Sequence, residues 1–583
     1  MKWIFYCYKF LFLFLFIFFV NSAMAGIPVT ISAPQPALAS RYDMGNLVPN
    51  IFTVTNNVPQ HSFPLTVSGI TGAINRIAVN NDCGSVIPSG PSTCQIGILI
   101  SPQRTDEDST ISQHLAIDYQ GRSLLSTTIS FTVPPLIFPA QIAIAVGNYN
   151  SAPQYPLLAQ VVQGPLRWRY VVDNTFLPTG YSDNGVFLGA SCSENICTSG
   201  GSYLHSNGNT YPLLVQTTDN GNNWLFKMDS TITPTDFGNQ GGFNATTCNH
   251  SKCVAGGEYS TSSLQYPLLA QTTDDGANWS YVIDSSLTPI LYRNYGQFQS
   301  VSCSDSVCIA GGAYQITNNK KIVGLLAESI NNGAWTYVID SHNQPIDYTS
   351  RGDFYSTSYG GGVYVAAGSY RVVLKGYPML AQSTDAGATW SYAISSTNLP
   401  SDFSNNGQLN GASCTNDFCI AVGCYTNTNQ KIYPMIARSQ HGAWTYVLDS
   451  SLSPPNYQSN AHFNASSCSN NFCIAAGNYS TDSGAHTFPL IAQSVDGGIT
   501  WSYPVSNISP ILPADYGATA DLNSANCTGI TCIASGYYTS GAVRLPLLVM
   551  TIDGGQSWFY RIYSNNLPRN FQELGLFRVS GMS

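Results

Sequence analysis

The chain has 583 residues, of which only 9% are charged, and its formal net charge at pH 7 is −9. This length exceeds a single ordinary core, and the scarcity of Lys and Arg argues against nucleic acid as a partner, because phosphate binding needs a dense basic surface. The apolar content of 44% excludes general disorder, and frequent Gly, Pro, Asn, Ser and Thr beyond residue 26 argue against long helices, so an all-β protein is expected.

Residues 1–25 are expected to be a secretory signal peptide. Lys2 and Lys9 supply the positive start, an apolar run covers 10–20, and Ala23 and Ala25 flank Met24 in a small-x-small cleavage site. The alternative is an uncleaved membrane anchor, which the short apolar run disfavours. No later stretch is long and apolar enough to span a membrane. We therefore expect a secreted, periplasmic or cell-surface protein.

A first folded domain is expected over residues 26–137. Residues 50–55 and 124–133 are rich in β-branched and aromatic residues, which predicts strands, and Cys83 and Cys94 are expected to form a disulfide. The stretch from 63 to 96 resembles the Ig-like domains of exported and surface bacterial proteins. That resemblance implies a β-sandwich module, with Pro134 and Pro135 marking the linker that follows.

An internal repeat fills residues 138–583. Apart from Trp3, the tryptophans recur every 54 to 57 residues, and each repeat offers four short strands bounded by turn residues. Four-stranded repeats of this kind are typical of β-propeller blades, and a linear β-solenoid is the alternative. The repeating tryptophans are Trp168, Trp224, Trp279, Trp335, Trp390, Trp444, Trp501 and Trp558.

The two ends of the repeat region favour the propeller. Phe577 follows the last Trp as an inner-strand residue should, but the chain stops at Ser583 before the next strand. Residues 142–149 match the second strand of a repeat, yet no first strand precedes them. The simplest interpretation is that the C-terminal strand completes the first blade, which satisfies edge backbone groups. We expect an eight-bladed propeller closed by the C-terminal strand.

The remaining cysteines follow a regular spacing. Pairs separated by four residues recur through the repeats, and such pairs in an exported chain are expected to be disulfides rather than zinc ligands, which prefer C-x2-C with nearby His. These pairs are Cys192/Cys197, Cys248/Cys253, Cys303/Cys308, Cys414/Cys419, Cys468/Cys473 and Cys527/Cys532. Cys424 is left over, and because its position varies between repeats it is expected to be a semi-buried free thiol rather than an intermolecular or catalytic cysteine.

Five repeats carry the turn motif [S/T]-x-D-x-G-x-x-W before the fourth strand. In a hairpin loop the Asp can accept backbone N–H bonds, the Gly can take a positive φ, and the Trp can pack back between strands. The motif residues are Asp219, Trp224, Asp274, Trp279, Asp385, Trp390, Asp496, Trp501, Asp553 and Trp558. The motif resembles the Asp-box (BNR) repeat of sialidases, sortilin-type receptors and photosystem II assembly-factor-like propellers. That resemblance places the Asp boxes on the rim, so these Asp are expected to be structural.

The same resemblance gives little support for catalysis. A sialidase-like site would need an arginine triad, a Tyr–Glu nucleophile pair and an Asp acid/base, but the early Arg-Ile-Pro element is absent. Arg578 is the only Arg on the expected first strands. Glu258, beside Tyr259, is the one carboxylate we name as a candidate for glycoside hydrolysis. The scattered His show no metal-ligand spacing, and neither a metal nor a cofactor is expected.

Residues Arg351, Gly352 and Asp353 spell the tripeptide that integrins recognise. Chance occurrence in a recurring turn is the simpler explanation. Exposure of the tripeptide in the repeat that lacks the cysteine pair would make it an adhesion site, so this remains a second hypothesis.

The sequence as a whole predicts a monomeric, exported bacterial propeller that binds a glycan or a protein. The alternatives are a sialidase-like glycoside hydrolase with unconventional catalytic residues and a non-catalytic assembly scaffold. No binding residue is assigned by the sequence. A ligand site should break the repeat pattern at the centre of the propeller, whereas a scaffold should not.

Overall fold

The computed structural model describes residues 29–34, 48–57, 63–68, 77–83, 86–87, 92–100, 109–119, 122–133, 137–317, 320–440, 442–482, 484–507 and 512–583. The expected signal peptide lies outside the described residues. Those residues form strands and turns, and they contain no helix that is long and apolar enough to cross a membrane. The chain divides into two compact units, Met1–Leu136 and Ile137–Ser583.

The first unit contains two four-stranded antiparallel sheets. Residues on one face of β2 are buried and those on the other are partly exposed, as in a sheet packed on one side. Cys83 and Cys94 form a disulfide, so their sulfurs are not available as ligands beside Asp82. One sheet has the order β1 (Val29–Ile31), β2 (Val48–Asn56), β6 (Ser92–Ile100) and β4 (Ile77–Asn81), and the other has β5 (Val86–Ile87), β3 (Phe63–Ser68), β7 (Ser109–Tyr119) and β8 (Arg122–Val133).

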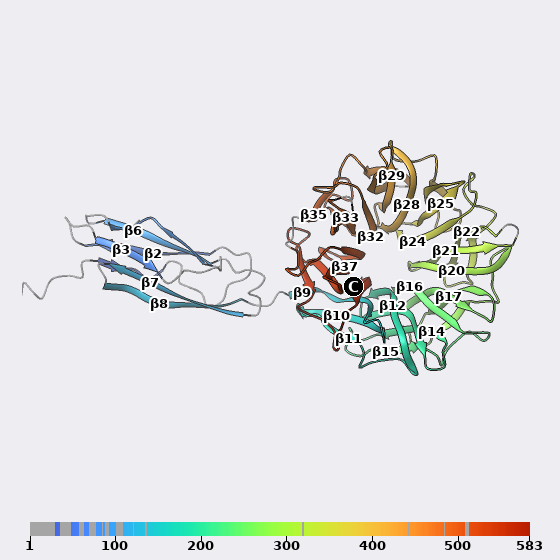
Figure 1. Ribbon diagram of the computed structural model, residues 1–583, viewed down its shortest axis with the longest axis horizontal. Helices are drawn as coiled ribbons and strands as arrows, with labels where there is room; N and C mark the ends of the chain where they lie inside the picture. Colours follow the sequence, from blue (N-terminus) through green and yellow to red (C-terminus); the bar gives the residue numbers. More distant parts are fainter. Residues whose placement is uncertain are drawn as a thin grey trace, which may run out of the picture. The chain divides into compact units, whose positions relative to one another are not determined.

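The second unit is built from successive sets of four antiparallel strands, which Figure 1 shows arranged around a common centre. Each set is named below by its strands. In chain order the strands are β9 (Ile137–Tyr149), β10 (Tyr155–Pro165), β11 (Arg169–Val172); β12 (Tyr181–Ser193), β13 (Ile196–His205), β14 (Thr210–Thr217), β15 (Leu225–Met228); β16 (Gln240–Asn249), β17 (Lys252–Ser260), β18 (Gln265–Thr272), β19 (Ser280–Ile283); β20 (Tyr292–Cys303), β21 (Val307–Ile316), β22 (Ile322–Ile330), β23 (Thr336–Ile339). They continue as β24 (Gly352–Gly360), β25 (Val363–Val372), β26 (Lys375–Ser383), β27 (Ser391–Ile394); β28 (Phe403–Cys414), β29 (Cys419–Asn427), β30 (Ile432–Gln440), β31 (Ala443–Leu448); β32 (Ala461–Ser469), β33 (Phe472–Ser480), β34 (Thr487–Ser494), β35 (Ser502–Val505); β36 (Ala520–Thr528), β37 (Thr531–Ser540), β38 (Val543–Thr551), β39 (Phe559–Ile562); and β40 (Gly575–Met582).

The last strand of the chain lies in the same sheet as the first strands of this unit. β40 pairs antiparallel with β9, giving a sheet of order β11-β10-β9-β40. The first strand of each set contacts the first strand of the next set, and β40 contacts both β36 and β12. The hydroxyl of Tyr170 also donates to the carbonyl of Asn566, so the β9–β11 and β36–β39 sets are joined by a side-chain bond as well. Residues far apart in the sequence are therefore neighbours here.

Each set brings a buried Phe or Leu of its first strand opposite a glycine of its second strand. A Cβ added to any of these glycines would lie 1.9–2.0 Å from a carbonyl oxygen of the first strand. Only glycine permits this close approach of two backbones, which explains why the Gly recurs in the sequence. The glycines are Gly147, Gly201, Gly257, Gly312, Gly368, Gly423, Gly477 and Gly536.

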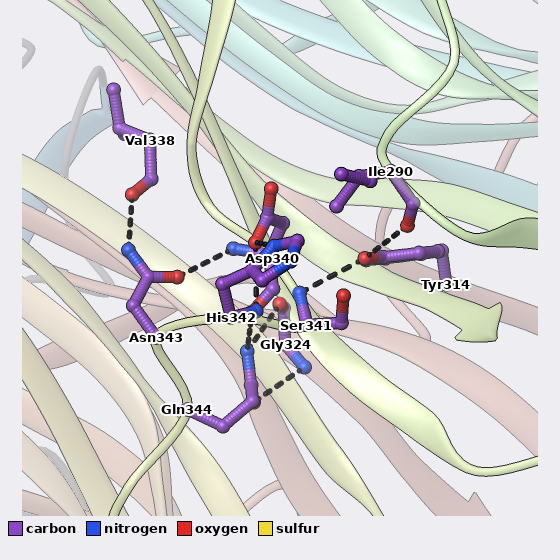
Figure 2. Close-up of polar contacts among 9 residues, drawn as sticks. All are labelled: Ile290, Tyr314, Gly324, Val338, Asp340, Ser341, His342, Asn343 and Gln344. Carbon is purple, nitrogen blue, oxygen red and sulfur yellow. Dashed lines mark hydrogen bonds and ion pairs between the residues drawn. The ribbon is translucent and has the colours of Figure 1, made fainter. Parts of the chain in front are cut away.

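A buried tyrosine two residues beyond this glycine holds the loop that leads to the next set. Its hydroxyl accepts the backbone N–H of the residue that follows the loop's Asp or its equivalent. Figure 2 shows Tyr314, whose hydroxyl accepts from the N–H of Ser341 at 2.9 Å and donates to the carbonyl of Ile290 at 2.8 Å. The equivalent tyrosines are Tyr149, Tyr203, Tyr259, Tyr370, Tyr425, Tyr479 and Tyr538. Part of the high Tyr content therefore serves loop geometry.

Hairpin disulfides join the first and second strands in most sets. The bonded pairs in this unit are Cys192–Cys197, Cys248–Cys253, Cys303–Cys308, Cys414–Cys419, Cys468–Cys473 and Cys527–Cys532. In the β24–β27 set the corresponding cross-strand pair is Tyr359 and Tyr364, whose ring centroids are 4.7 Å apart. An aromatic pair therefore replaces the covalent bond there.

The Tyr359/Tyr364 position should accept a disulfide. We expect Tyr359→Cys/Tyr364→Cys to form the bond, because the native bonded pairs at this register have Cα–Cα separations of 4.0–4.2 Å. The disulfide should make this variant more stable than Tyr359→Ser/Tyr364→Ser. The gain should be only about 2 kcal/mol, because the closed loop is short. Denaturant unfolding compares the two variants, and thiol titration of the denatured chain detects the bond. Two additional free thiols relative to the wild type would contradict the expectation.

Candidate functional site

The Asp boxes form closed hydrogen-bond networks within their loops. Asp274 accepts bonds from the hydroxyl of Thr272 at 2.7 Å, the backbone N–H of Asn278 at 2.9 Å and the side-chain amide of Asn278 at 2.8 Å. These donors, led by the backbone N–H of Asn278, lower the pKa of Asp274 to about 2. Gly276 has a φ of 80°, which a side chain would strain. The Asp274 carboxylate therefore bonds to donors of its own loop, which is a structural role.

Most of the repeating tryptophans join neighbouring sets. The indole N–H of Trp224 donates to the side-chain oxygen of Gln160 in the preceding set at 2.7 Å, and Trp279, Trp335, Trp444 and Trp558 bond glutamines in the same way. Trp390 bonds Glu328 of the preceding set, whereas Trp501 donates to the Gly498 carbonyl of its own loop. The buried indole N–H of Trp168 has no hydrogen-bond partner in the described part of the chain. The residue equivalent to those glutamines in the β36–β39 set is Met550, whose thioether is a poor acceptor. This part of the repeat serves packing between sets.

One layer of cross-strand pairs departs from the repeat. It lies immediately beside the Phe–Gly pairs, on the first and second strands of each set, and is called the variable layer below. Its pairs are Val186/Ser202, Gly242/Glu258, Gln297/Ala313, Asp353/Ser369, Gln408/Cys424, His462/Asn478, Asp521/Tyr537 and Leu576/Asn148. The residues of this layer are charged, polar or apolar in different sets, with no repeating pattern. The adjacent layer, in contrast, has Phe or Leu opposite Gly in every set.

On the third strand of each set, the residue in the same layer is nearly constant. The variation is therefore confined to the two inner strands. Pro occupies this position in all sets but β20–β23, where it is Gly324. Pro has no N–H to satisfy, but Gly324 has one. The Gln344 side chain accepts from that N–H at 3.1 Å and donates to the Gly324 carbonyl at 2.9 Å, as Figure 2 shows. The outer position therefore follows backbone requirements.

A cavity of about 640 Å³ opens against the variable layer and is called the funnel cavity. Its lining comes from the first strands of several sets and from the β36–β39 set. The lining residues are Leu188, Asn244, Gln297, Gln299, Asp521, Asn523, Tyr537, Arg544, Leu576, Arg578 and Val579. Five of these eleven residues are polar and uncharged, three are apolar, and the other three are Asp521, Arg544 and Arg578.

Arg578 occupies a position that is structural in other sets. There the residue after the buried Phe or Leu is often Asn, and its amide donates to a carbonyl of the next first strand, as Asn523 does to Phe577 at 2.9 Å. Asn244, Asn410 and Asn464 make the same bond. Arg578 instead bonds the Asn148 side-chain oxygen through Nε at 3.3 Å. Its terminal guanidinium nitrogens are not used in that bond, and its side chain lines the cavity.

Arg544 joins Arg578 from a different strand. It is the second residue of β38, and its guanidinium carbon lies 4.4 Å from the ring centroid of Tyr537. Burial and the neighbouring charge of Arg544 lower the pKa of Arg578. Within the described residues neither arginine forms an ion pair. The two cations therefore converge without a carboxylate bridging them.

The acidic residue that lines the cavity does not fully offset this charge. Burial raises the pKa of Asp521 and lowers the pKa of His462, with which it interacts. The Asn464 amide donates to Asp521 Oδ1 at 2.8 Å, and the Asn478 amide lies 3.1 Å from His462 Nε2. Both titratable groups are thus shifted toward their uncharged forms. The funnel cavity is left electropositive through Arg544 and Arg578.

The sequence indicated Arg578 but missed Arg544. Arg544 precedes the Leu-Pro step of its third strand, where other sets have Thr210, Gln265, Ile322, Gly376, Ile432 and Thr487. A charge at an otherwise uncharged repeat position was the available signal. The expectation that Arg578 is the only arginine on the first strands is wrong, because β20 begins at Tyr292 and includes Arg293.

Glu258 belongs to the variable layer but does not line the funnel cavity. Its carboxylate accepts from the Asn244 amide at 2.6 Å, and Asn244 does line that cavity. Burial raises the pKa of Glu258 to about 7, and the hydrogen bond from Asn244 opposes this shift. A glutamic acid that is half-protonated near neutral pH can donate or accept a proton.

The raised pKa of Glu258 has a consequence for stability. Because the folded state holds this proton more tightly than the unfolded chain does, the stabilisation is fully present below a pH of about 4.5 and is lost as the pH rises through about 7. We expect this group to lower the free energy of unfolding by on the order of 3 kcal/mol at alkaline pH. Glu258→Gln should remove that part of the pH dependence, as measured by urea unfolding across pH 4 to 9.

The control for this measurement is Glu194→Gln, since Glu194 is an exposed glutamate with a side chain 62% accessible. It should leave the shape of the pH–stability curve unchanged. Parallel curves for the wild type and Glu258→Gln would contradict the expectation.

The structure contradicts the adhesion hypothesis for Arg351-Gly352-Asp353. The Asp353 side chain is only 1% exposed, and Arg351 Nε donates to its Oδ2 at 2.6 Å. An integrin must reach both charged side chains, but here they bind each other and Asp353 is buried. The hypothesis is wrong because the tripeptide enters β24, where its Asp joins the variable layer.

Cys424 is a free thiol with intermediate exposure, and it pairs with Gln408 in the variable layer. Burial raises its thiol pKa to about 12, so the thiolate needed for nucleophilic or redox chemistry is disfavoured at neutral pH.

Comparison with known proteins gives structural likeness without a close relative. No family model and no curated protein matches the chain. Among solved structures, YjhT aligns at 10% identity with a TM-score of 0.33, over 54% of this chain and 96% of YjhT. A mutant Trypanosoma rangeli sialidase displaying trans-sialidase activity aligns at 10% identity and TM-score 0.33, over 55% of this chain and 57% of the sialidase. A polysaccharide lyase, the PL25 ulvan lyase, aligns at 11% identity and TM-score 0.35, over 69% of this chain and 96% of the lyase. Because the sequence identities and TM-scores are this low, the activities and ligands of those proteins are not assigned to this chain.

Proposed function

We propose that this chain is an exported bacterial glycan-binding protein, with an Ig-like sandwich over residues 26–137 and an eight-bladed propeller over 138–583 that β40 closes. The Asp boxes and hairpin disulfides stabilise the propeller, and its funnel cavity binds a saccharide that carries a carboxylate. The Ig-like domain spaces or presents the propeller at the cell surface or in the secreted protein.

The observation that supports this function is the convergence of Arg544 and Arg578 in the funnel cavity without an acidic partner of their own. Arginine presents a planar fork of donors that matches a carboxylate, and two such forks can bind one anion strongly. The amides of Asn244, Gln299 and Asn523 line the same cavity and suit sugar hydroxyls. A cavity of about 640 Å³ has the size of small-ligand sites.

Calorimetric titration of the full chain tests the proposal with four probes: trigalacturonate and 3′-sialyllactose, which carry carboxylates, and maltotriose and lactose, which do not. We expect at least one acidic probe to bind at least about 10-fold more tightly than its neutral counterpart. The affinity should fall as salt is added. Binding of neither acidic probe, or equal binding of acidic and neutral probes, would overturn the proposal.

Glycoside hydrolysis is a second candidate function, supported by the raised pKa of Glu258 beside the funnel cavity and of Asp521 in its wall. Glycoside hydrolases use two carboxyl groups, one of which is kept protonated as a general acid by a raised pKa. In this proposal Glu258 is the acid, and Asn244 positions its carboxyl group.

A reducing-end assay on the same acidic oligosaccharides tests this second function. Hydrolysis should be abolished by Glu258→Gln while binding in the calorimeter persists, and its rate should fall as the pH rises through about 7. Binding without release of reducing ends would leave the propeller as a binding protein. Hydrolysis that survives in Glu258→Gln would exclude Glu258 as the acid.

A further inference from the structure

A second cavity, of about 370 Å³, lies between the β24–β27 and β28–β31 sets and is called the side cavity. Arg351, Tyr355, Ser369, Arg371 and Gln408 are among its lining residues. It shares no lining residue with the funnel cavity. It is therefore a separate concavity of the same propeller, with its own pair of arginines.

The two arginines occupy directly opposed positions on adjacent strands. The backbone N–H of Arg371, on β25, donates to the carbonyl of Arg351 at 2.8 Å, just before β24 begins. The same backbone bond in other sets joins uncharged residues, as from Ser480 to Asn460 and from Thr539 to Thr519. Like charges on directly opposed strand positions destabilise a sheet. The β24–β27 set thus carries an unfavourable pair where equivalent positions are neutral.

Only one of the two cations is neutralised by the protein. Asp353 binds Arg351 through Nε, which fixes the guanidinium and leaves its terminal nitrogens available. Arg371 is exposed and has no acidic partner in the described segments. The net charge of these three groups is positive, and both arginines line a cavity large enough for a substituted sugar or a small anion.

The remaining lining supplies neutral hydrogen-bonding groups. The hydroxyls of Tyr355 and Ser369 lie 2.9 Å apart and are half-buried, and the Gln408 amide comes from the neighbouring set. Hydroxyl and amide groups beside two guanidinium forks can complete the coordination of an oxyanion. Lysines at these positions would supply positive charge without the bidentate fork of arginine, and aliphatic residues would supply no hydrogen bonds.

We propose that the side cavity is a second oxyanion-binding site, which takes a sulfate, phosphate or carboxylate group between Arg351 and Arg371. Bound oxyanion relieves the repulsion between the two guanidinium groups, and Asp353 holds Arg351 in position to bind it. The site stands independently of the proposed ligand of the funnel cavity. Together the two cavities would let one propeller engage a ligand with more than one anionic group.

Equilibrium dialysis with radiolabelled sulfate tests the site, in the full chain carrying Arg544→Gln/Arg578→Gln so that the funnel arginines do not contribute. We expect this chain to bind one sulfate, and adding Arg371→Gln to weaken that binding at least about 10-fold. Competition by inorganic phosphate and by acetate then ranks the tetrahedral against the planar oxyanions. Arg371 is preferred to Arg351 for substitution, because removing Arg351 would leave the buried Asp353 carboxylate without its partner.

Lys375→Gln is the matched control, since Lys375 is a cation on the same hairpin that does not line the side cavity. It should leave sulfate affinity within about 2-fold, as expected for a screened exposed charge. Arg371→Gln should also leave the unfolding midpoint unchanged or raised, because it removes one of two like charges at opposed strand positions. Absence of sulfate binding in the Arg544→Gln/Arg578→Gln chain, or an equal loss in both cation variants, would overturn the proposal.

Discussion

Replacing Arg544 and Arg578 together by glutamine is expected to weaken binding of the acidic oligosaccharide by about 100-fold or more, because each charge-assisted hydrogen bond contributes about 1.5–3 kcal/mol. The two arginines supply the positive charge of the funnel cavity, where the pKa shift of Asp521 favours its uncharged form. Calorimetric titration of wild type and variant with the acidic probe that binds best measures the change. The slope of affinity against salt concentration should also become shallower.

Two further variants make this result specific. Arg569→Gln removes an exposed arginine that does not line the cavity and should leave affinity unchanged. Arg544→Lys/Arg578→Lys keeps the charge but removes the bidentate fork, so its affinity should lie between those of the wild type and the glutamine variant. An Arg544→Gln/Arg578→Gln chain that binds the acidic probe as tightly as the wild type would show that the carboxylate is bound elsewhere.

Gly257→Ala is expected to destabilise the propeller by about 3 kcal/mol, at the upper end of the range for overpacked cores. A Cβ at Gly257 would lie 1.9 Å from the carbonyl oxygen of Gly242 and 2.8 Å from the Cα of Phe243. Both neighbours are backbone atoms held in the ladder between β16 and β17, so relief requires the strands to separate. Denaturant unfolding measures the effect, and the disulfide Cys248–Cys253 keeps the hairpin connected in both proteins.

Gly242→Ala provides the comparison within the same pair of strands. A Cβ at Gly242 would lie 3.2 Å from the Ser202 side chain and 3.6 Å from the Gly201 carbonyl oxygen, and the φ of Gly242 is not in the left-handed region. This substitution should change the free energy of unfolding by less than about 1 kcal/mol. Similar destabilisation by the two alanines would contradict the explanation that close backbone approach selects glycine.

The contrast between the two neighbouring layers links the fold to the proposed sites. The Phe–Gly layer is constant because its atoms are in contact on all sides, so each set must solve the same packing problem. The variable layer has a cavity on one side, and its residues differ from set to set. Glu258, Asp353 and Asp521 all belong to it, and the funnel arginines lie beside it. The same repeat therefore supports a rigid scaffold and an asymmetric binding surface.

Much of the local structure could be predicted from the sequence because it depends on short-range patterns. The cysteine spacing predicted hairpin disulfides, which form because the paired residues face each other across a tight turn. The alternation of turn residues with β-branched and aromatic residues predicted strands and no long helix, and the described residues agree. The spacing of the tryptophans indicated sets of four strands, which the sheets contain.

The candidate sites could not be located in this way. Arg544 and Arg578 are 34 positions apart and lie on strands of different sheets, so their convergence depends on β40 returning beside β9 and β36. Arg351 and Asp353 belong to a tripeptide for which the sequence left an adhesion role open as a second hypothesis, but the structure buries the Asp in an ion pair within the protein. The partner of the Trp224 indole, Gln160, belongs to the preceding set and could not be inferred from the loop alone.

The sequence by itself determined a weakly charged all-β chain with a repeat of four strands, because strand propensity, turn chemistry and cysteine spacing act over a few residues. Only the tertiary structure decided which of the few charges meet. The low charged fraction of 9% does not by itself indicate a ligand. Packing of the sets, however, places Arg544 with Arg578 and Arg351 with Arg371 in the walls of cavities. Electrostatic interaction depends on distance and burial in space, and neither is encoded in the spacing of residues along the chain.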